Sequence, residues 1–324
     1  MKMRVLSVLL GLCLVFMLAL TVPNQASAKK LIIFAGGPAG GTFQVVAQAI
    51  ATYKPVKALN YNIKVQSSGG STENLRKVNA GKAHFGTVYS GHVFAGRKGM
   101  MVNDPKKYDQ VMAVCYLYEA PAQLVVRKGS GIKSVKDLIG KRVAVGPAGS
   151  GAFSYCEMFF THLEVWDKIE RNAISYNAGA DAFSNKQVDA LWLFTAYPSS
   201  AVVQAATMNS IELVDLDADA RKYGFYEKFQ NFVPWNIPTS DGNYRGVSKD
   251  VPSWVDSTLL VANVKAPEDL VYNMLKAIFT PEGLAWMVQQ KKTFKAMSVE
   301  KGTKGIATPL HPGAEKFWKE KGLL

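Results

Sequence analysis

Three glycine-rich turns, each leading directly into a helix-like segment, constrain this chain more than any other feature. They lie at residues 36–41, 68–71 and 146–151. The first turn of a helix leaves backbone amides without partners inside the helix and carries partial positive charge. Glycine has no side chain, so a ligand can approach that backbone closely. Several such helix starts facing one cleft would bind a small anion without any catalytic group, and we expect that arrangement here.

The N-terminus has the pattern of an export signal. Lys2 and Arg4 precede an uncharged, mostly apolar run at residues 5–20, and Ala26-Ser27-Ala28 has the form of a cleavage site. We expect residues 1–28 to be a signal peptide cleaved after Ala28, which sends the protein to the periplasm. The apolar run is long for a signal, so an uncleaved membrane anchor is the alternative.

Length and charge narrow the possible partners. The chain has 324 residues, enough for two lobes after the signal is removed. Its formal net charge of +13 favours an anionic partner, whether a solute or a membrane surface. The lysines are dispersed and form no long basic run, so no nucleic-acid partner is expected.

The histidines and cysteines predict neither a metal site nor a cofactor. The four histidines, too scattered for metal-ligand spacing, are His84, His92, His162 and His311. The periplasm would permit a disulfide between Cys115 and Cys156, but only the distance between them decides it. Cys156 lies on an apolar helical stripe, so we expect it to behave as a small buried hydrophobic residue.

The pattern of the first third of the chain predicts a parallel α/β unit. Short apolar strands are expected at residues 31–35, 63–66 and 85–89. Apolar residues at i, i+3, i+4 and i+7 from Phe43 predict an amphipathic helix after the first strand. Ligands of such units bind beyond the C-terminal ends of the strands, where the glycine turns lie.

A second unit repeats this order. Strands are expected at residues 142–145 and 189–194, and an apolar stripe from Phe153 predicts the helix after the third glycine turn. The β-prone stretch at 111–126 is expected to cross into this unit, and residues 259–264 are expected to return from it.

We therefore expect an α/β fold of two lobes with a ligand cleft between them. Lobe 1 comprises residues 29–117 and 256–324, and lobe 2 comprises residues 118–255. Because no low-complexity linker separates the lobes, they are expected to share crossing strands and to move about a hinge.

Five motifs in a fixed order make the chain recognisable. They are A-G-G-P-A-G-G-T-F at residues 35–43, S-G-G-S-T-E-N-L-R at 68–76, V-A-V-G-P-A-G-S-G at 143–151, Q-V-D-A-L-W-L-F-T-A-Y-P at 187–198 and P-L-H-P-G-A at 309–314. Together they resemble the solute receptors of tripartite ATP-independent periplasmic (TRAP) transporters, specifically the TAXI family. Each motif alone is weak because glycine turns are common, but five in order are specific.

The resemblance implies a two-lobed periplasmic-binding-protein fold, type II-like. Each lobe would be a mainly parallel sheet flanked by helices, and crossing hinge strands would join the lobes. The cleft would close like a Venus flytrap on glutamate, glutamine, 2-oxoglutarate or a similar dicarboxylate, and the receptor would deliver it to an ion-driven TRAP permease. The family lacks the single ligand-clamping arginine of better-known receptors, and none of the three glycine turns contains an arginine.

The expected ligand-binding residues lie at the glycine turns and just beyond the strands. Amides and hydroxyls would bind the anionic group, Phe43 would line the aliphatic part, and Tyr197 would close over the solute. The full set is Gly40, Gly41, Thr42, Phe43, Gly70, Ser71, Asn74, Tyr89, Ser90, Ser150, Gly151, Ala152, Thr195 and Tyr197. A structural role is expected for His311, in a turn, and for Asp189, which would tie a helix end.

Two other functional classes remain as alternatives. An exported enzyme is disfavoured because Ala152 stands where a phosphate-binding loop needs lysine, and Ser150 lacks the flanking glycines of a nucleophile elbow. No catalytic residue is therefore expected. An exported sensor subunit of a signalling system would use the same fold, and the sequence does not separate it from a transport receptor.

Overall fold

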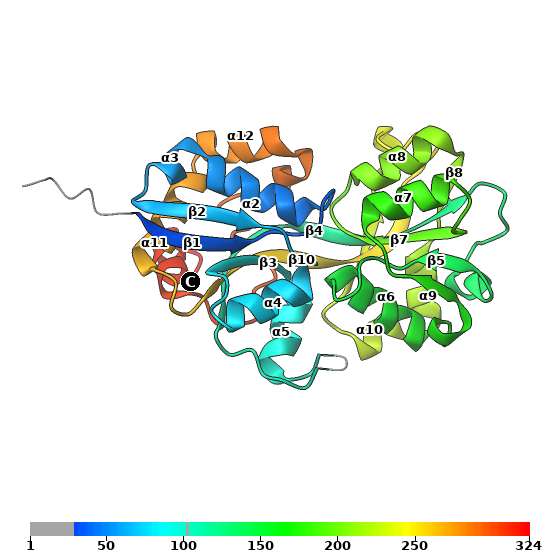
Figure 1. The fold of residues 1–324 in the computed structure, drawn as a ribbon, viewed down its shortest axis with the longest axis horizontal. Coiled ribbons are helices and arrows are strands. Elements are labelled where there is room, and N and C mark those ends of the chain that lie inside the picture. Colours follow the sequence, from blue (N-terminus) through cyan, green and yellow to red (C-terminus); the bar gives the residue numbers. More distant parts are fainter. Residues whose placement is uncertain (1–28, 102–103) are drawn as a thin grey trace, which may run out of the picture. The chain divides into compact units, whose positions relative to one another are not determined.

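A single mixed β-sheet runs through the described part of the molecule (Figure 1). The computed structural model describes residues 29–101 and 104–324, so the predicted signal peptide lies outside the described residues. Ten strands run in the order β2-β1-β3-β10-β4-β7-β5-β6, with β8 paired to β4 and β9 to β10. Their bounds are β1 Lys30–Ala35, β2 Tyr61–Gln66, β3 Phe85–Tyr89, β4 Val111–Arg127, β5 Arg142–Ala144, β6 Glu170–Asn172, β7 Ala190–Phe194, β8 Ile211–Leu213, β9 Val233–Ile237 and β10 Val251–Asn263.

The strand order is the same in the two halves of the sheet. On one side of the central pair β10-β4 the order outward is β3-β1-β2, and on the other it is β7-β5-β6. Strand β1 pairs in parallel with β3, and β5 pairs in parallel with both β6 and β7. The predicted repetition of a parallel unit is therefore confirmed.

The two central strands run through both halves. Strand β4 pairs with β10 as far as Pro121 and with β7 from Ala122 onward. Strand β10 begins at Val251, earlier than the predicted start at Leu259, and its first residues pair with β9. Both faces of this added segment are mostly buried, so it lacks the alternation that marks a half-exposed strand. The β10–β4 register shifts at Thr258/Leu259 and at Leu260/Val261.

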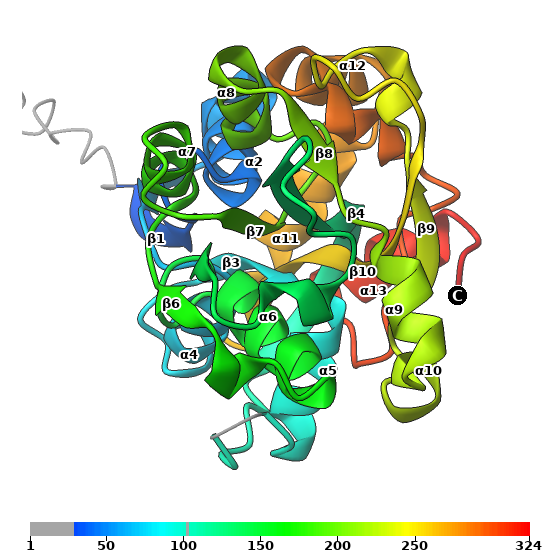
Figure 2. The same ribbon diagram turned by 90° about the vertical axis from the view of Figure 1, so that its right-hand side faces the viewer.

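Helices cover both faces of the sheet (Figures 1 and 2). Helices α2, α3, α7, α8 and α12 lie on one face, and α4, α5, α6, α9 and α10 lie on the other. The bounds are α2 Thr42–Thr52, α3 Lys54–Lys57, α4 Ser71–Asn79, α5 Ser90–Lys98, α6 Gly151–His162, α7 Tyr176–Ser184, α8 Ser200–Met208, α9 Leu216–Lys222, α10 Phe225–Lys228, α11 Glu268–Ile278, α12 Pro281–Gln290 and α13 Pro312–Glu320. Short 3-10 helices are η1 Val135–Leu138, η2 Trp166–Lys168, η3 Thr239–Asp241 and η4 Lys292–Ala296.

The residues assigned structural roles from sequence hold elements together. His311 caps α13, since its Nδ1 accepts the Gly313 amide while its Nε2 contacts the Ala266 carbonyl. The Asp189 carboxylate accepts hydrogen bonds from the side chain and the backbone amide of Arg142. It therefore links the start of β5 to the residue just before β7, and not to a helix end as predicted.

Of the three cysteines in the sequence, the two that lie in the described residues are buried and form no disulfide there. Cys115 lies on β4, and Cys156 lies on α6. Burial raises the pKa of both thiols, so neither is a reactive thiolate near neutral pH. The prediction that Cys156 is a small core residue is confirmed.

Candidate functional site

The three glycine turns meet at one cavity. Its lining comes from the first turns of α2, α4 and α6, with Tyr176 at the start of a fourth helix, α7. The volume is about 20 Å³, room for one water molecule. We call it the glycine-turn cavity, and its lining is Pro38, Gly41, Thr42, Phe43, Gly69, Gly70, Ser71, Tyr89, Pro147, Ser150, Gly151, Ala152, Tyr176 and Thr195.

The helix starts keep amide groups available at this cavity. Gly41 precedes α2 and Gly70 precedes α4, and neither helix has a side-chain cap. In α6 the Ser150 hydroxyl accepts only the Phe153 amide, at 3.0 Å. The Gly151 and Ala152 amides belong to the first helical turn, which has no acceptor inside the helix. Gly70 has φ of 114°, a conformation that glycine adopts readily, and this places α4 against the cavity.

The turns of the two halves approach each other to side-chain contact. A Cβ added at Gly151 would lie 2.6 Å from the Ser71 Cβ and 2.8 Å from the Tyr89 ring. The Thr72 hydroxyl donates to the Gly149 carbonyl across the same gap. The Thr42 and Thr195 hydroxyl oxygens lie 3.4 Å apart. Glycine is therefore required at position 151 for this close approach.

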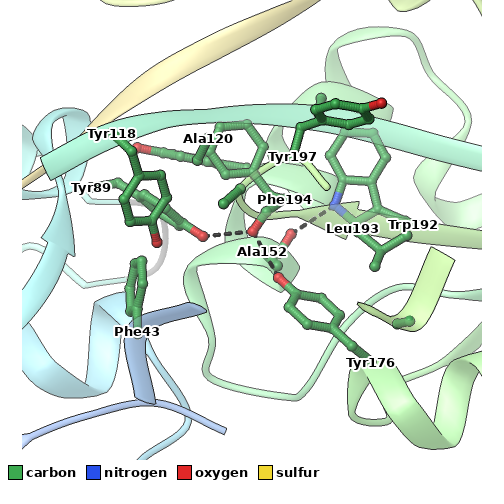
Figure 3. Close-up of a cluster of buried hydrophobic side chains, with 14 of the residues drawn as sticks. Phe43, Tyr89, Tyr118, Ala120, Ala152, Tyr176, Trp192, Leu193, Phe194 and Tyr197 are labelled. Atoms are coloured by element: carbon green, nitrogen blue, oxygen red, sulfur yellow. Dashed lines mark hydrogen bonds between the residues drawn. The ribbon is translucent and has the colours of Figure 1, made fainter. Parts of the chain in front are cut away.

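Aromatic side chains form one wall of the cavity (Figure 3). The hydroxyls of Tyr89 and Tyr176 both donate to the Phe194 carbonyl, at 2.6 and 2.7 Å. The Phe43 and Tyr89 rings meet edge to face with centroids 5.0 Å apart. Tyr89 ends β3 and Phe194 ends β7, so the bond from Tyr89 also joins the two halves of the sheet.

Of the predicted ligand-binding residues, ten line this cavity and four do not. Gly40 turns toward α7, where an added Cβ would lie 2.4 Å from the Asn177 side chain. The Asn74 amide group donates to the Gly36 and Thr87 carbonyls and so braces the first glycine turn. The Ser90 hydroxyl donates to the Gly305 carbonyl, and the Tyr197 hydroxyl donates to Asp241 and the Pro238 carbonyl.

Four lining residues were not predicted from the sequence: Pro38, Gly69, Pro147 and Tyr176. The first three belong to the glycine turns already identified. Tyr176 follows Ser175, whose hydroxyl accepts the Ala178 amide as a helix cap. That cap was the available signal, but the preceding strand β6 is short, polar and mostly exposed, so no strand was predicted before it.

The glycine-turn cavity is lined by neutral polar groups rather than by charged side chains. Its lining, as far as the structure describes it, includes no Lys, Arg, Asp or Glu side chain. The nearby Glu73 accepts the Gly69 amide at 2.7 Å and pairs with Lys77 at 2.6 Å, so its charge is locally balanced. An anion here would be held by amides, hydroxyls and helix starts.

A serine–histidine contact lies behind the cavity wall. The Ser71 hydroxyl is 2.9 Å from His92 Nδ1 and accepts the Tyr89 amide. Burial lowers the pKa of His92 to about 3, far below the value near 7 that suits a general base. This pair is therefore poorly suited to activate a nucleophile.

A second, larger cavity lies between α5, α6 and the segment after α10. Its volume is about 580 Å³, and Phe, Met and Tyr side chains supply the large apolar groups of its lining. We call it the α5–α6 cavity. His92 and Tyr155, whose rings stack with centroids 4.2 Å apart, belong to its wall.

Two further findings concern metals and membranes. Within residues 29–101 and 104–324, no group of three or more His, Cys, Asp or Glu side chains is placed to hold a metal ion. The helices of the same ranges include none with both the length and the apolar character of a membrane span.

Comparison with solved structures shows the fold. MatC from Rhodopseudomonas palustris, solved with bound malate, is 16% identical, with a TM-score of 0.54 over 90% of this chain and 97% of MatC. A protein from Bordetella bronchiseptica RB50 is 16% identical, with a TM-score of 0.51 over 90% of this chain and 83% of that one. The periplasmic aliphatic sulphonate binding protein SsuA from Escherichia coli is more distant, at 13% identity and a TM-score of 0.42 over 81% and 78%.

The likenesses to MatC and to the Bordetella bronchiseptica protein agree with the strand order on the architecture. The predicted two-lobed periplasmic-binding-protein fold, with helices flanking each half of the sheet, is confirmed. The amino-acid sequence itself matches a protein-family model, that of the NMT1-like family, over residues 34–322. The chain belongs to the NMT1-like family.

Proposed function

We propose that this protein is a periplasmic solute-binding receptor for a small carboxylate. The candidate solutes are glutamate, glutamine, 2-oxoglutarate and similar dicarboxylates. The motif order further supports a TAXI-type receptor that is exported by its signal peptide and hands the solute to a TRAP permease. In this role the protein binds and releases its ligand without chemistry.

The convergence of helix starts carries this proposal. The first turns of α2 and α4 come from one half of the sheet, and those of α6 and α7 come from the other. A carboxylate between them would accept hydrogen bonds from both halves, which favours their approach. The bound malate of MatC gives an example of a dicarboxylate in a protein of this fold.

The volume of the glycine-turn cavity requires motion. A space of about 20 Å³ does not admit a dicarboxylate, so the lobes must separate before the solute enters. We place the lobe boundaries at residues 117/118 and 255/256, which lie on β4 and β10, the two strands that run through both halves. Solute binding then shifts the equilibrium between separated and approached lobes.

A thermal-shift panel tests the ligand class. Purified protein is melted with increasing glutamate, glutamine, 2-oxoglutarate and malate, and with a neutral sugar and an amine as controls. A ligand that binds only the folded state raises Tm as its concentration rises. We expect at least one carboxylate to do so. Flat curves for all carboxylates, with a shift by the sugar or the amine, would refute the carboxylate assignment.

The delivery partner needs a separate test. A neighbouring gene for a multi-span permease favours transport, whereas a neighbouring sensor kinase favours signalling. Uptake of the solute identified by the panel into vesicles that carry the permease should require the receptor. Uptake that proceeds equally well without it would contradict the transport role.

A further inference from the structure

The α5–α6 cavity has the size and lining of a binding site in its own right. Its volume of about 580 Å³ falls within the range of small-molecule pockets, which are mostly apolar with a few polar groups. It is far larger than the glycine-turn cavity. Its apolar lining includes Phe94, Met101, Tyr155, Met158, Phe229 and Phe232.

The polar groups that line this cavity, as far as the structure describes them, are neutral except for one lysine. Lys228 is exposed at the cavity and is the one charged side chain in the described lining. Asp256 lies behind the wall, where its carboxylate accepts the Tyr155 hydroxyl at 2.6 Å and the Gly91 amide at 2.9 Å. Asp256 is thus covered by residues that themselves line the cavity. The balance favours a ligand with an anionic group near Lys228.

One buried polar atom of the wall is left without a partner. His92 Nδ1 contacts the Ser71 hydroxyl, whereas Nε2 has no hydrogen-bond partner in the described part of the chain. The residue is 4% exposed. A buried polar atom without a partner is costly, and a polar group of a ligand that reached Nε2 from this cavity would supply one.

We propose that the α5–α6 cavity is a second ligand site, which takes a small amphiphilic anion. The apolar body packs against the methionine and phenylalanine side chains, and the anionic head lies near Lys228. Methionine suits this role because its flexible side chain adapts to differently shaped apolar ligands. The site is separate from the glycine-turn cavity, from which the Ser71–His92 contact and the Tyr89 ring divide it.

The chain offers a closely matched control for Lys228. Lys222 ends α9 as Lys228 ends α10, and both are exposed. Lys222 Nζ lies 5.3 Å from the centre of the following Tyr223 ring, and Lys228 Nζ lies 5.4 Å from the following Phe229 ring. Lys222 does not line the cavity. The variants Lys222→Glu and Lys228→Glu therefore make the same change of charge in similar surroundings, and they differ mainly in how far that charge lies from the proposed site.

Fluorescence titration with anilinonaphthalene sulfonate, an aromatic anion, tests the proposal. We expect Lys228→Glu to weaken binding about fivefold or more at low salt, because an attraction becomes a repulsion, and Lys222→Glu to leave it unchanged within about twofold. Met158→Trp, which fills the cavity, should abolish binding, and a melting curve checks that this variant is folded. Equal affinity of the two lysine variants overturns the proposal.

Competition distinguishes this site from the receptor site. Saturating 2-oxoglutarate or glutamate should not displace the probe, and displacement would place the probe in the glycine-turn cavity and overturn a separate site. The titration needs no carboxylate ligand. It can therefore succeed if the proposed function fails, and it can fail if that function holds.

Discussion

The two cavities lie between the same two lobes, but different kinds of chemical group line them. The glycine-turn cavity is bounded by backbone, hydroxyls and glycines that approach to side-chain contact, and it has a volume of about 20 Å³. The α5–α6 cavity is bounded by long apolar side chains and has a volume of about 580 Å³. The first therefore depends on where the backbone lies, whereas the second depends on the shapes of adaptable side chains. We therefore expect one methyl group added to the backbone of the first cavity to change its ligand affinity strongly. Removal of a methionine side chain from the second should have a much smaller effect.

The largest effect is expected from Gly151→Ala. The new Cβ would lie 2.6 Å from the Ser71 Cβ, so the lobes could not approach as they do here. We expect carboxylate affinity to fall about 100-fold, which corresponds to about 2.7 kcal/mol. Calorimetric titration measures it, with Ser154→Ala as the control because Ser154 lies one turn further along α6 and does not line this cavity. Unchanged affinity in Gly151→Ala would show that the lobes do not close on the ligand at this turn.

A smaller, pH-dependent effect is expected from Asp256→Asn at the wall of the α5–α6 cavity. Burial raises the pKa of Asp256 from 3.8 to about 7, so the folded state holds a proton that the unfolded state has lost between these values. This contribution to stability is complete below pH 3.8 and disappears as the pH rises through about 7. Asparagine does not ionise, so the variant should gain stability over the natural protein as the pH rises from 4 to about 7 and little more above that.

Denaturant unfolding from pH 4 to pH 8 measures that difference. His92 acts in the opposite direction, because burial lowers its pKa from 6.5 to about 3 and its stabilisation is lost as the pH falls below 6.5. Each pH therefore needs the natural protein beside the variant, so that the His92 contribution cancels. A stability difference that does not change with pH would show that Asp256 does not titrate in this range.

The smallest effect on the receptor site is expected from Met158→Ala. Met158 is half-buried and lines only the larger of the two cavities. Carboxylate affinity should stay within about twofold of the natural value, since the helix starts are untouched, and the loss of stability should be about 1 kcal/mol. A large loss of carboxylate binding would mean that the two cavities act as one site, and the contrast between them would fail.

Much of this arrangement could be predicted from local patterns. Glycine turns after apolar strands predicted the starts of α2, α4 and α6, and parallel α/β topology brings such starts to one place. Local patterns could not predict which way individual side chains point. Tyr197 was expected to face the solute, but its hydroxyl faces η3, and this depends on a partner, Asp241, distant in the sequence. Tyr176 was missed because β6 has no apolar pattern.

The α5–α6 cavity was beyond sequence reasoning for a similar reason. Its walls come from α5, α6 and the segment after α10, each of which contributes one or two apolar residues. In the sequence, such residues are indistinguishable from ordinary core positions. Their failure to pack against one another becomes visible only when the elements are placed in space.

The register shifts between β10 and β4 bear on the lobe motion that the proposed function requires. At Thr258/Leu259 and at Leu260/Val261, β4 carries one more residue than β10. Each extra residue is a β-bulge, which bends its strand and increases the local twist while the flanking ladder stays intact. Bulges placed beside the crossover allow small changes of dihedral angle to be distributed along several residues. A wide swing of the lobes would then need no broken strand and no single pivot.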